Sequence, residues 1–392
     1  ALPIAIKAQE EGFTGFMLPT ANAKEAAIVG DLKVYGIDNI KQVIDFFDKG
    51  TPLEQTIIDT REEFYKNLDF PEFDFSDVKG QESIKRCMEI AAAGGHNVIL
   101  IGPPGAGKTM LAKRLPSILP PMTLHEALET TKIHSVVGKI KNMGLMSQRP
   151  FRSPHHTISD VALVGGGSYP QPGEISLSHN GVLFLDELPE FKRGVLEVLR
   201  QPLEDREVTI SRARFTVTYP SSFMLVASMN PSPGGYFNDP DAPVTSSPAE
   251  MQRYLSKISG PLLDRIDIHI EVTPVPFEKL SEERKGEGSV EIRKRVTSAR
   301  EIQTLRFSEL ENVHYNAQMN TKQIRLYCKL DEKSKSLLKN AMERLNLSAR
   351  AYDRILKVAR TIADLGGDTN LNGDHISEAI QYRSLDREGW LG

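Results

Sequence analysis

Cysteine and tryptophan are scarce, because the 392-residue chain has only two cysteines and one tryptophan. Cys87 and Cys328 lie far apart in sequence and form no CxxC pair, which argues against a disulfide framework or a cysteine zinc site and fits a reducing cytoplasm. The sequence also lacks an apolar run of 18 residues and a signal peptide, so we expect no membrane partner and a cytoplasmic location.

A charge excess of either sign is missing as well, since 48 lysines and arginines against 52 aspartates and glutamates leave a net charge of −4. Any basic surface for nucleic acid must therefore be local. Hydrophobic residues make up 40% and charged residues 26% of the chain, as in ordinary globular proteins. The length is sufficient for two or three domains, each with its own core.

The pattern along the chain predicts four segments. Residues 1–50 alternate helix-like and strand-like runs in an αβαβα order, and residues 51–75 have the composition of a linker. Strands and helices alternate through residues 76–277, which is typical of a parallel α/β sheet. Residues 278–392 are charged and then helical, with apolar residues at i, i+3, i+4 and i+7, so we expect a separate all-helical lid.

Residues 102–109, GPPGAGKT, match the P-loop pattern G-x-x-x-x-G-K-[ST]. They follow the strand-like run NVILI and precede the helix-like run MLAKRL, as the motif requires. The glycines let backbone N–H groups surround phosphates, while Lys108 reaches the β- and γ-phosphate oxygens and Thr109 binds Mg²⁺. We therefore predict that ATP and Mg²⁺ bind at Gly102, Pro103, Pro104, Gly105, Ala106, Gly107, Lys108, Thr109 and Met110.

Two further apolar runs end in polar residues. The run VLFL is followed by Asp186 and Glu187, and we expect Asp186 to hold Mg²⁺ and Glu187 to deprotonate the attacking water. The run FMLVASM is followed by Asn230, whose amide would face the γ-phosphate. Alternatively, the carboxylates cap the next helix and Asn230 forms a turn. The P-loop and these two strand ends together favour ATP hydrolysis over simple binding.

These motifs, together with ISGPLLDRIDIHIEV at 258–272 and LSARAYDRILKVARTIADL at 347–365, resemble the Mg-chelatase-like AAA+ ATPases of the ComM/YifB type. The resemblance covers essentially the whole chain. It implies a three-layer P-loop AAA+ domain with a parallel sheet at 76–277 and a C-terminal helical domain at 278–392. It also implies that residues 1–50 are the closing part of a Lon-protease-like (S5-type) module, whose first part we expect to be missing because the chain begins without methionine.

The resemblance assigns roles to residues outside the strand ends. Arg265 would be an arginine finger that contacts ATP on the neighbouring subunit, where such a group is worth roughly 10³–10⁵ in rate. Arg350 would be the sensor 2 arginine, with Arg354 one helical turn later as the competing candidate. The segment FSDVKGQ, which includes Val78, would cradle the adenine. Without the resemblance, Arg265 would be interpreted as a surface ion pair.

Residues 151–176, FRSPHHTISDVALVGGGSYPQPGEIS, lie between the P-loop and Asp186. The resemblance implies that they contain a glycine-tipped insert in helix 2 that projects into the pore of a hexamer. Adjacent histidines point to opposite sides of a strand, so His155 and His156 would be poor joint metal ligands. A hydrolase centre at Ser153 is disfavoured because no G-x-S-x-G accompanies it. The histidines remain structural or pore-proximal groups, with DNA contact open.

The segment REVTISRARFTVTYP at 206–220 predicts a β-hairpin with Arg212 and Arg214 near its tip. These arginines could supply a local basic surface for DNA phosphates, and Tyr169 at the tip of the insert could stack on a base. Alternatively, the arginines protect a solvated hairpin edge and Tyr169 is an ordinary loop residue.

The leading functional hypothesis is a cytoplasmic AAA+ motor, a homohexamer that hydrolyses ATP to move along DNA. The resemblance implies a helicase that promotes branch migration during recombination of incoming DNA in natural transformation. One alternative is a chelatase-type motor subunit, although nothing in the sequence resembles a porphyrin pocket. Another is a Lon-like protein remodeller or protease, although residues 1–50 contain no serine for a Ser/Lys dyad.

Overall fold

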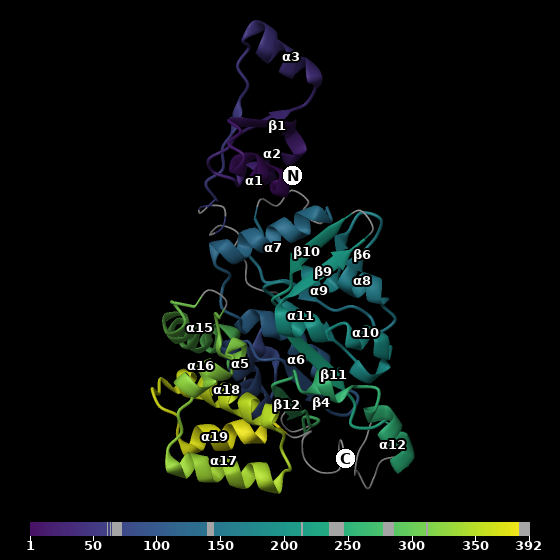
Figure 1. Ribbon diagram of the computed structural model, residues 1–392, viewed down its shortest axis with the longest axis vertical. Helices are drawn as coiled ribbons and strands as arrows, with labels where there is room; N and C mark the ends of the chain where they lie inside the picture. The colour runs from purple at the N-terminus through teal and green to yellow at the C-terminus, as the bar shows by residue number, and fades with distance from the viewer. Residues whose placement is uncertain are drawn as a thin grey trace.

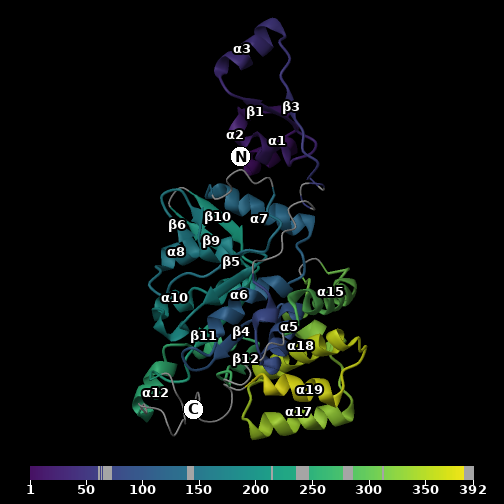
Figure 2. The ribbon, with the colours of Figure 1, turned by 180° about the vertical axis from the view of Figure 1, so that it is seen from behind.

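The computed structural model describes residues 1–60, 62, 64, 73–138, 145–212, 215–234, 247–276, 286–310 and 313–383. Figure 1 shows a small N-terminal module at one end of the long axis, with the α/β core below it and the C-terminal helical region beside the lower part of the core. The view from behind in Figure 2 shows the same arrangement. No helix among the described residues is long and apolar enough to cross a membrane.

The core is built on a five-stranded sheet. Its strands lie in the order β12-β4-β11-β8-β5 and are all parallel. Their bounds are β4 Val98–Ile101, β5 Phe151–Arg152, β8 Val182–Leu185, β11 Met224–Met229 and β12 Ile268–Glu271. Parallel strands need crossover connections, which place helices over both faces of the sheet.

Both faces are buried, as the strand residues show. Val98 and Leu100 join one hydrophobic core, while the alternate residues Ile99 and Ile101 join another. The first face is covered by α5 (Glu82–Gly94), α6 (Lys108–Ile118), α15 (Ser289–Arg306) and α18 (Ala349–Gly366). The second face is covered by η2 (Leu188–Glu190), α10 (Arg193–Glu197), α11 (Arg200–Asp205), α12 (Pro248–Leu255) and α13 (Gly260–Leu263). This arrangement confirms the predicted three-layer α/β fold.

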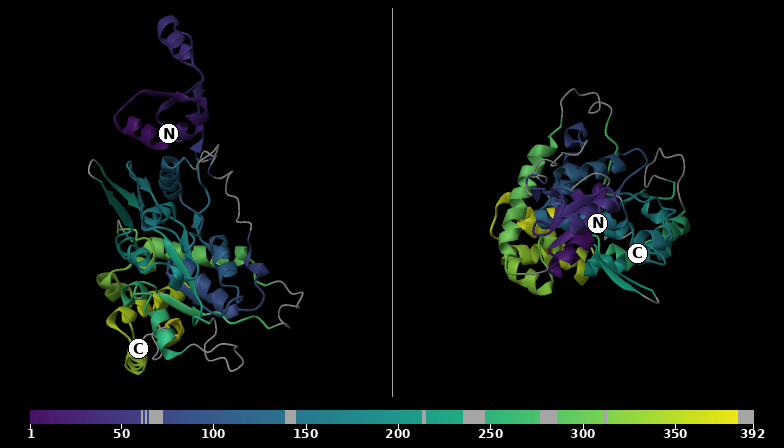
Figure 3. Two further views of the ribbon diagram at one scale, coloured as in Figure 1. Left: turned by 90° about the vertical axis from the view of Figure 1, so that its right-hand side faces the viewer. Right: turned by 90° about the horizontal axis from the view of Figure 1, so that it is seen from above.

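The N-terminal module has the element order αβαβα through residue 50, as its sequence pattern predicts. The elements are α1 (Leu2–Glu10), β1 (Gly15–Pro19), α2 (Thr20–Ala27), β2 (Lys33–Ile37) and α3 (Ile40–Lys49). A third strand, β3 (Gln55–Thr56), pairs antiparallel with β2, so the sheet extends into the segment expected as a linker. The module shares a hydrophobic cluster with α7 (Leu124–Val136) and stands at one end of the molecule (Figure 3).

Two hairpins lie at the end of the core nearest the N-terminal module (Figure 1). The first is the predicted insert, in which β6 (Gly165–Gly166) and β7 (Gln171–Pro172) separate α8 (Asp160–Val164) from α9 (Glu174–Leu177). The second, also as predicted, is formed by β9 (Glu207–Ser211) and β10 (Thr216–Pro220).

The C-terminal region is helical, as the sequence predicts. Besides α15 and α18 it contains η3 (Asn316–Gln318), α16 (Thr321–Tyr327), α17 (Glu332–Arg344) and α19 (Gly373–Gln381). Both α15 and α18 pack against α5 on the first face of the sheet. The chain returns to the core after α19, where the His269 N–H at the edge strand β12 donates to the Tyr382 carbonyl oxygen at 2.7 Å.

Candidate nucleotide-binding site

The P-loop joins β4 to the N-terminus of α6. Gly105 and Gly107 have φ values of 79° and 92°, which glycine adopts far more readily than other residues. A Cβ atom on Gly102 would lie 2.2 Å from the carbonyl oxygen of Val272. The loop backbone therefore needs glycine at these positions, and it leads into a helix N-terminus, which is a favourable place for phosphate. Pro104 is exposed at the turn of the loop, whereas Met110 packs against the core.

Lys108 at the start of α6 and Asn230 directly after β11 converge beside this loop. The Lys108 ammonium donates hydrogen bonds to the carbonyl oxygens of Gly102 at 2.6 Å and Pro103 at 2.9 Å, and to Asn230 Oδ1 at 3.1 Å. Burial lowers the pKa of Lys108, and the nearby carboxylates of Asp186 and Glu187 oppose this shift.

Thr109 and Asp186 meet at the predicted metal position. The Thr109 hydroxyl donates to Asp186 Oδ2 at 2.8 Å, and the other carboxylate oxygen accepts from Ser228 Oγ. A hydroxyl and a carboxylate oxygen fit Mg²⁺, which binds through one or two protein oxygens together with phosphate oxygens and water. Among the described residues, no group of three or more histidine, cysteine, aspartate or glutamate side chains forms a separate metal centre.

Glu187 follows Asp186 with its backbone held and its side chain accessible. It has a left-handed backbone, with φ 55°, and its N–H donates to Ser228 Oγ at 3.1 Å. The carboxylate side chain is 57% exposed, and its Oε2 lies 3.9 Å from Nδ1 of His156. An accessible carboxylate beside Lys108 and Asp186 could accept a proton from water at this edge of the sheet.

The predicted adenine segment is tied to the P-loop. It includes η1 (Phe75–Asp77), and Val78 directly after it is fully buried. Gln81 donates from its side-chain amide to the carbonyl oxygens of Ala106 at 3.2 Å and Thr273 at 2.9 Å. These bonds hold the segment against the loop that would carry the phosphates.

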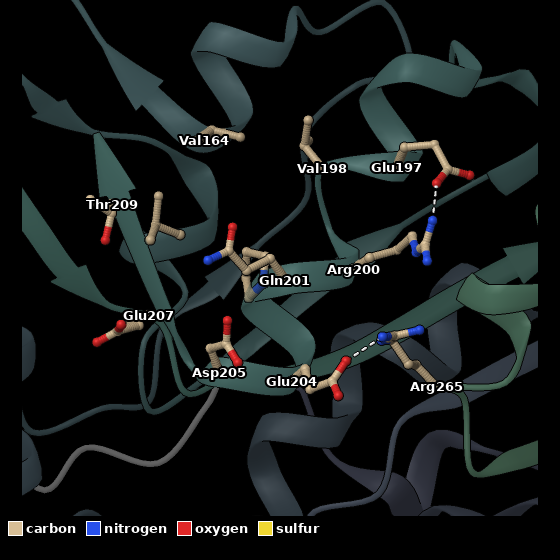
Figure 4. Close-up of a pocket in the computed structure, with 12 residues that line it drawn as sticks. Val164, Glu197, Val198, Arg200, Gln201, Glu204, Asp205, Glu207, Thr209 and Arg265 are labelled. Atoms are coloured by element: carbon tan, nitrogen blue, oxygen red, sulfur yellow. Dashed lines mark hydrogen bonds and ion pairs between the residues drawn. The ribbon is translucent and has the colours of Figure 1, made fainter. Parts of the chain in front are cut away.

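Arg265 lies at the amino-terminal ends of the parallel strands, whereas the P-loop lies at their carboxyl-terminal ends. It precedes β12, whose first residue Ile268 is level with Val98 at the start of β4, whereas the P-loop follows the end of β4. Four strand residues span about 13 Å. The guanidinium donates to the Pro261 carbonyl oxygen at 2.7 Å and pairs with Glu204 at a cavity of about 470 Å³ (Figure 4). Arg265 therefore does not meet the P-loop of its own chain.

The two sensor 2 candidates, which are on α18, also lie at the amino-terminal ends of the strands. Arg350 is 68% exposed and donates to Asp264 Oδ2 at 2.6 Å. Arg354 donates to Oδ1 of the buried Asp267 at 2.8 Å. A lid would bring Arg350 to the P-loop of its own chain, but α18 packs on α5 and the structure places Arg350 beside Arg265 instead. The exposed Arg350 is available to a second chain, whereas Arg354 links α18 to the core.

The candidate DNA residues gather where the two hairpins touch. Tyr169 and Phe215 have ring centroids 6.2 Å apart and are 77% and 47% exposed, and the Tyr219 hydroxyl donates to the Pro170 carbonyl oxygen at 2.9 Å. Arg212 is exposed at the end of β9, and Arg214 lies outside the described residues. Sequence reasoning missed Phe215, although an aromatic residue among polar residues at a hairpin tip was the available signal.

The orientation of His155 and His156 differs from the one predicted. The expectation that they point to opposite sides of a strand is wrong, because β5 ends at Arg152 and a turn follows, in which the Ile158 N–H donates to the His155 carbonyl oxygen at 3.0 Å. The two rings lie side by side with centroids 4.0 Å apart. His155 faces Thr157, with Nδ1 3.0 Å from Oγ1, while His156 faces Glu187. His156 thus belongs to the surroundings of the candidate site.

The strand order, the P-loop after β4 and the polar groups after β11 and β8 define the P-loop fold of the AAA+ class. Within that class, the chain belongs to the Mg-chelatase-like family that includes ComM and YifB. The family model "Magnesium chelatase, subunit ChlI" matches residues 74–280, and "Magnesium chelatase, subunit ChlI C-terminal" matches residues 286–383. The family resemblance predicted from the sequence is confirmed.

Individual relatives agree with this family. The chain is 45% identical over 386 residues to Competence protein ComM of Haemophilus influenzae, covering 98% of this chain and 74% of that protein. It is 49% identical over 315 residues to the uncharacterized protein YifB of Escherichia coli, covering 80% and 61% of the two chains. A more distant similarity, 26% over 184 residues, links 42% of this chain to 52% of the magnesium-chelatase 38 kDa subunit of Rhodobacter capsulatus.

Proposed function

We propose that this chain is a ring-forming ATPase that moves along DNA and promotes branch migration during recombination of incoming DNA. The observation that carries the ring is the separation of Arg265 and Arg350 from the P-loop of the same chain. Arg265 and Arg350 can reach a nucleotide only at the P-loop of a second copy, and closed rings, here a homohexamer, let every P-loop receive them.

The proposed hydrolysis assigns one task to each residue. Mg²⁺, when bound with ATP, neutralises charge that develops on the phosphates, and Thr109 and Asp186 would hold it. Lys108 and Asn230 would orient the γ-phosphate, and Glu187 would accept the proton of the attacking water. Arg265 of the adjacent copy would stabilise the transition state. The family and the P-loop support ATPase activity.

The DNA part of the proposal is supported by the paired hairpin tips. Exposed aromatic rings can stack on bases, and an adjacent arginine can contact phosphate without sequence preference. The surface formed by Tyr169, Phe215 and Arg212 combines these two features on a chain with no global basic charge. The name of the Haemophilus relative, a competence protein, agrees with a role in handling incoming DNA.

The test is steady-state ATP hydrolysis with and without single-stranded DNA and a four-way junction, followed by a branch-migration assay on the junction. We expect DNA to raise turnover in the wild type. The double variant Arg212→Ala/Arg214→Ala should lose this increase and keep its DNA-free turnover, because it loses phosphate contacts. Arg325→Ala, which removes an exposed arginine on α16, is the matched control and should behave as the wild type.

Other outcomes point to the alternatives. Turnover that ignores DNA in an assembled ring would contradict the DNA motor. Stimulation by tetrapyrrole-binding chelatase subunits would then favour a chelatase motor, to which the family model and the Rhodobacter similarity lend weight. Stimulation by an unfolded protein would favour a Lon-like remodeller.

A further inference from the structure

A small cavity lies between the α/β core and the C-terminal helical region, at the amino-terminal ends of the strands. Its walls come from the turn after α11, from the segments before β4, β11 and β12, and from η3 and α18. The volume is about 50 Å³, which is room for a small ion or a few water molecules. Pockets for drug-sized ligands have about 300–1,000 Å³, so a nucleotide does not fit here.

The charged side chains that line this cavity have an excess of positive charge. They are Arg206, Arg265, Arg354 and Asp267. Oδ1 of Asp267 accepts a hydrogen bond from Arg354 at 2.8 Å, so this carboxylate already has a cationic partner. Burial lowers the pKa of Arg206, and burial together with the charge of Arg354 lowers the pKa of the nearby Lys357 to about 8. A bound anion would offset the positive charge that causes part of these shifts.

Two buried donors of the lining have no hydrogen-bond partner in the part of the chain that the structure describes. One is the hydroxyl of Ser221, a residue that is 1% exposed. The other is Nε of Arg265, whose terminal nitrogens bind the Pro261 carbonyl oxygen and Glu204. Buried donors in folded proteins are normally paired, so both point to an acceptor that is not part of the chain.

The remaining polar side chains of the wall also offer donors. The hydroxyls of Ser222 and Tyr315 lie 3.1 Å apart and share one hydrogen bond, so one hydroxyl proton is left to donate elsewhere. Oε1 of Gln318 accepts from the His314 N–H at 2.6 Å, so its amide nitrogen is the end that can donate. Water needs acceptors as well as donors around it, whereas the four oxygens of a tetrahedral anion accept in several directions. The lining therefore suits an anion better than water.

We propose that this cavity binds a tetrahedral oxyanion of the phosphate or sulfate class. Its oxygens accept from Ser221 Oγ and Arg265 Nε, and the guanidinium of Arg206 balances its charge. An anion held from these directions fastens η3 and α18 to the core, and it fixes the proposed arginine finger from within its own chain. The inference goes beyond the proposed function, because it depends neither on ATP hydrolysis nor on DNA binding.

The first measurement is the thermal midpoint of the wild type against sodium sulfate, with sodium chloride at matched ionic strength. A ligand that binds the folded chain stabilises it along a one-site binding curve, with a half-saturating concentration that a variant of the site can shift. The general stabilising effect of sulfate is exclusion from the protein surface, which no single buried residue controls. We expect a rise of about 2–4 °C with sulfate beyond the rise with chloride.

Variants then separate the cavity from the P-loop, which is a second place where sulfate could bind. Ser221→Ala should leave the midpoint in sulfate-free buffer unchanged or slightly higher, because the hydroxyl that it removes has no partner. Its half-saturating sulfate concentration should rise about tenfold, since one hydrogen bond to a charged group is lost. Arg206→Gln should raise this concentration at least as much. The controls Ser377→Ala and Arg325→Gln change exposed residues on α19 and α16 and should respond as the wild type.

Selenate, a sulfate analogue whose selenium scatters anomalously, locates the ion in a crystal grown without phosphate or sulfate. A peak within about 4 Å of Arg265 Nε and Ser221 Oγ supports the proposal. A peak at the P-loop alone would overturn it, as would an equal sulfate response in the wild type and Ser221→Ala. A chloride response as large as that to sulfate, and equally sensitive to Ser221→Ala, would also overturn it, because the site would then hold a monatomic ion. If Arg206→Gln does not fold, Ser221→Ala and the selenate map decide.

Discussion

The Arg350 guanidinium donates a hydrogen bond to the Asp264 carboxylate at 2.6 Å, and this bond joins residues 86 positions apart in the chain. Since Asp264 directly precedes Arg265, the bond places two arginines from different regions of the sequence on one face of the molecule. That face is the edge of the sheet away from the P-loop. A site that combines these arginines with the P-loop at the other end of the strands requires two copies of the chain.

Mixing two inactive variants should restore activity. Arg265→Ala lacks the proposed arginine finger and Glu187→Gln lacks the proposed base, so we expect each alone to hydrolyse ATP slowly. In a random 1:1 ring, about a quarter of the interfaces combine an intact Glu187 with an intact Arg265 from the neighbour. Steady-state ATP hydrolysis of the mixture should therefore reach a substantial fraction of the wild-type rate. A mixture no faster than the mean of its components would show that Arg265 does not act across the interface.

Glu187→Gln should separate binding from hydrolysis. The amide cannot accept a proton from water, so we expect turnover to fall by about 10²–10⁴, whereas ATP affinity should stay within a few-fold of wild type. Fluorescent-nucleotide titration and a phosphate-release assay measure the two quantities. Glu190→Gln, which removes a carboxylate from an exposed pair with Lys257, is the matched control and should remain active. Fast phosphate release by Glu187→Gln would exclude it as the base.

Replacing Arg354 should mainly lower stability, whereas replacing Arg350 should mainly slow hydrolysis. Removing Arg354 leaves the buried Asp267 with one cationic partner fewer, so we expect Arg354→Ala to lower the free energy of unfolding by about 3 kcal/mol. The exposed bond of Arg350 should contribute at most about 1 kcal/mol, while Arg350→Ala slows hydrolysis. Urea unfolding measures the stability of the two variants, and ATPase assays measure their turnover. The reverse result would make Arg354 the residue that contacts nucleotide.

Gly102→Ala should damage the P-loop. The added Cβ would lie 2.2 Å from the Val272 carbonyl oxygen, so the loop or β12 must shift. We expect both a lower free energy of unfolding and weaker nucleotide binding. Gly194→Ala is the control, because its Cβ meets nothing within 4 Å and alanine favours helix α10 by about 1 kcal/mol. Unchanged nucleotide affinity in Gly102→Ala, measured by titration, would contradict the role of this close contact.

Stability should fall below about pH 6.5. Burial lowers the pKa of His96, against the opposing effect of Asp267, and lowers that of His269 well below its ordinary value. The unfolded chain binds protons at these histidines before the folded chain does. The contribution of these histidines to the free energy of unfolding is therefore complete above the unfolded pKa of about 6.5. On acidification it decreases by up to about 1.4 kcal/mol per pH unit for each histidine.

Urea titrations at pH 7.0 and 5.5 measure this dependence. His269→Gln should reduce the difference between the two pH values, because one buried titrating group is removed. The exposed histidine variant His125→Gln should leave the difference unchanged. A wild type equally stable at both pH values would show that the buried histidines do not differ in proton binding between folded and unfolded chains.

Much of the P-loop edge is predictable from the order of motifs. Asp186 and Asn230 directly follow apolar runs, and Lys108 follows the run of β4 through the P-loop. The carboxyl ends of parallel strands meet at one side of a sheet, so these three residues had to come together once β4, β8 and β11 lay in one sheet. His156 escaped this reasoning because its position depends on where β5 ends. The turn after Arg152, and not the alternation of a strand, directs its ring toward Glu187.

The sequence by itself determined the P-loop, because the motif is contiguous and its glycine conformations and helix N-terminus are local properties of the backbone. It also determined the three-layer class through its alternating apolar runs. Only the tertiary structure decided that Arg265 and Arg350 share the far edge, and that Tyr169 and Phe215 share a hairpin contact. These pairs lie far apart along the chain, and the packing of α18 on α5 and of one hairpin on the other brings them together.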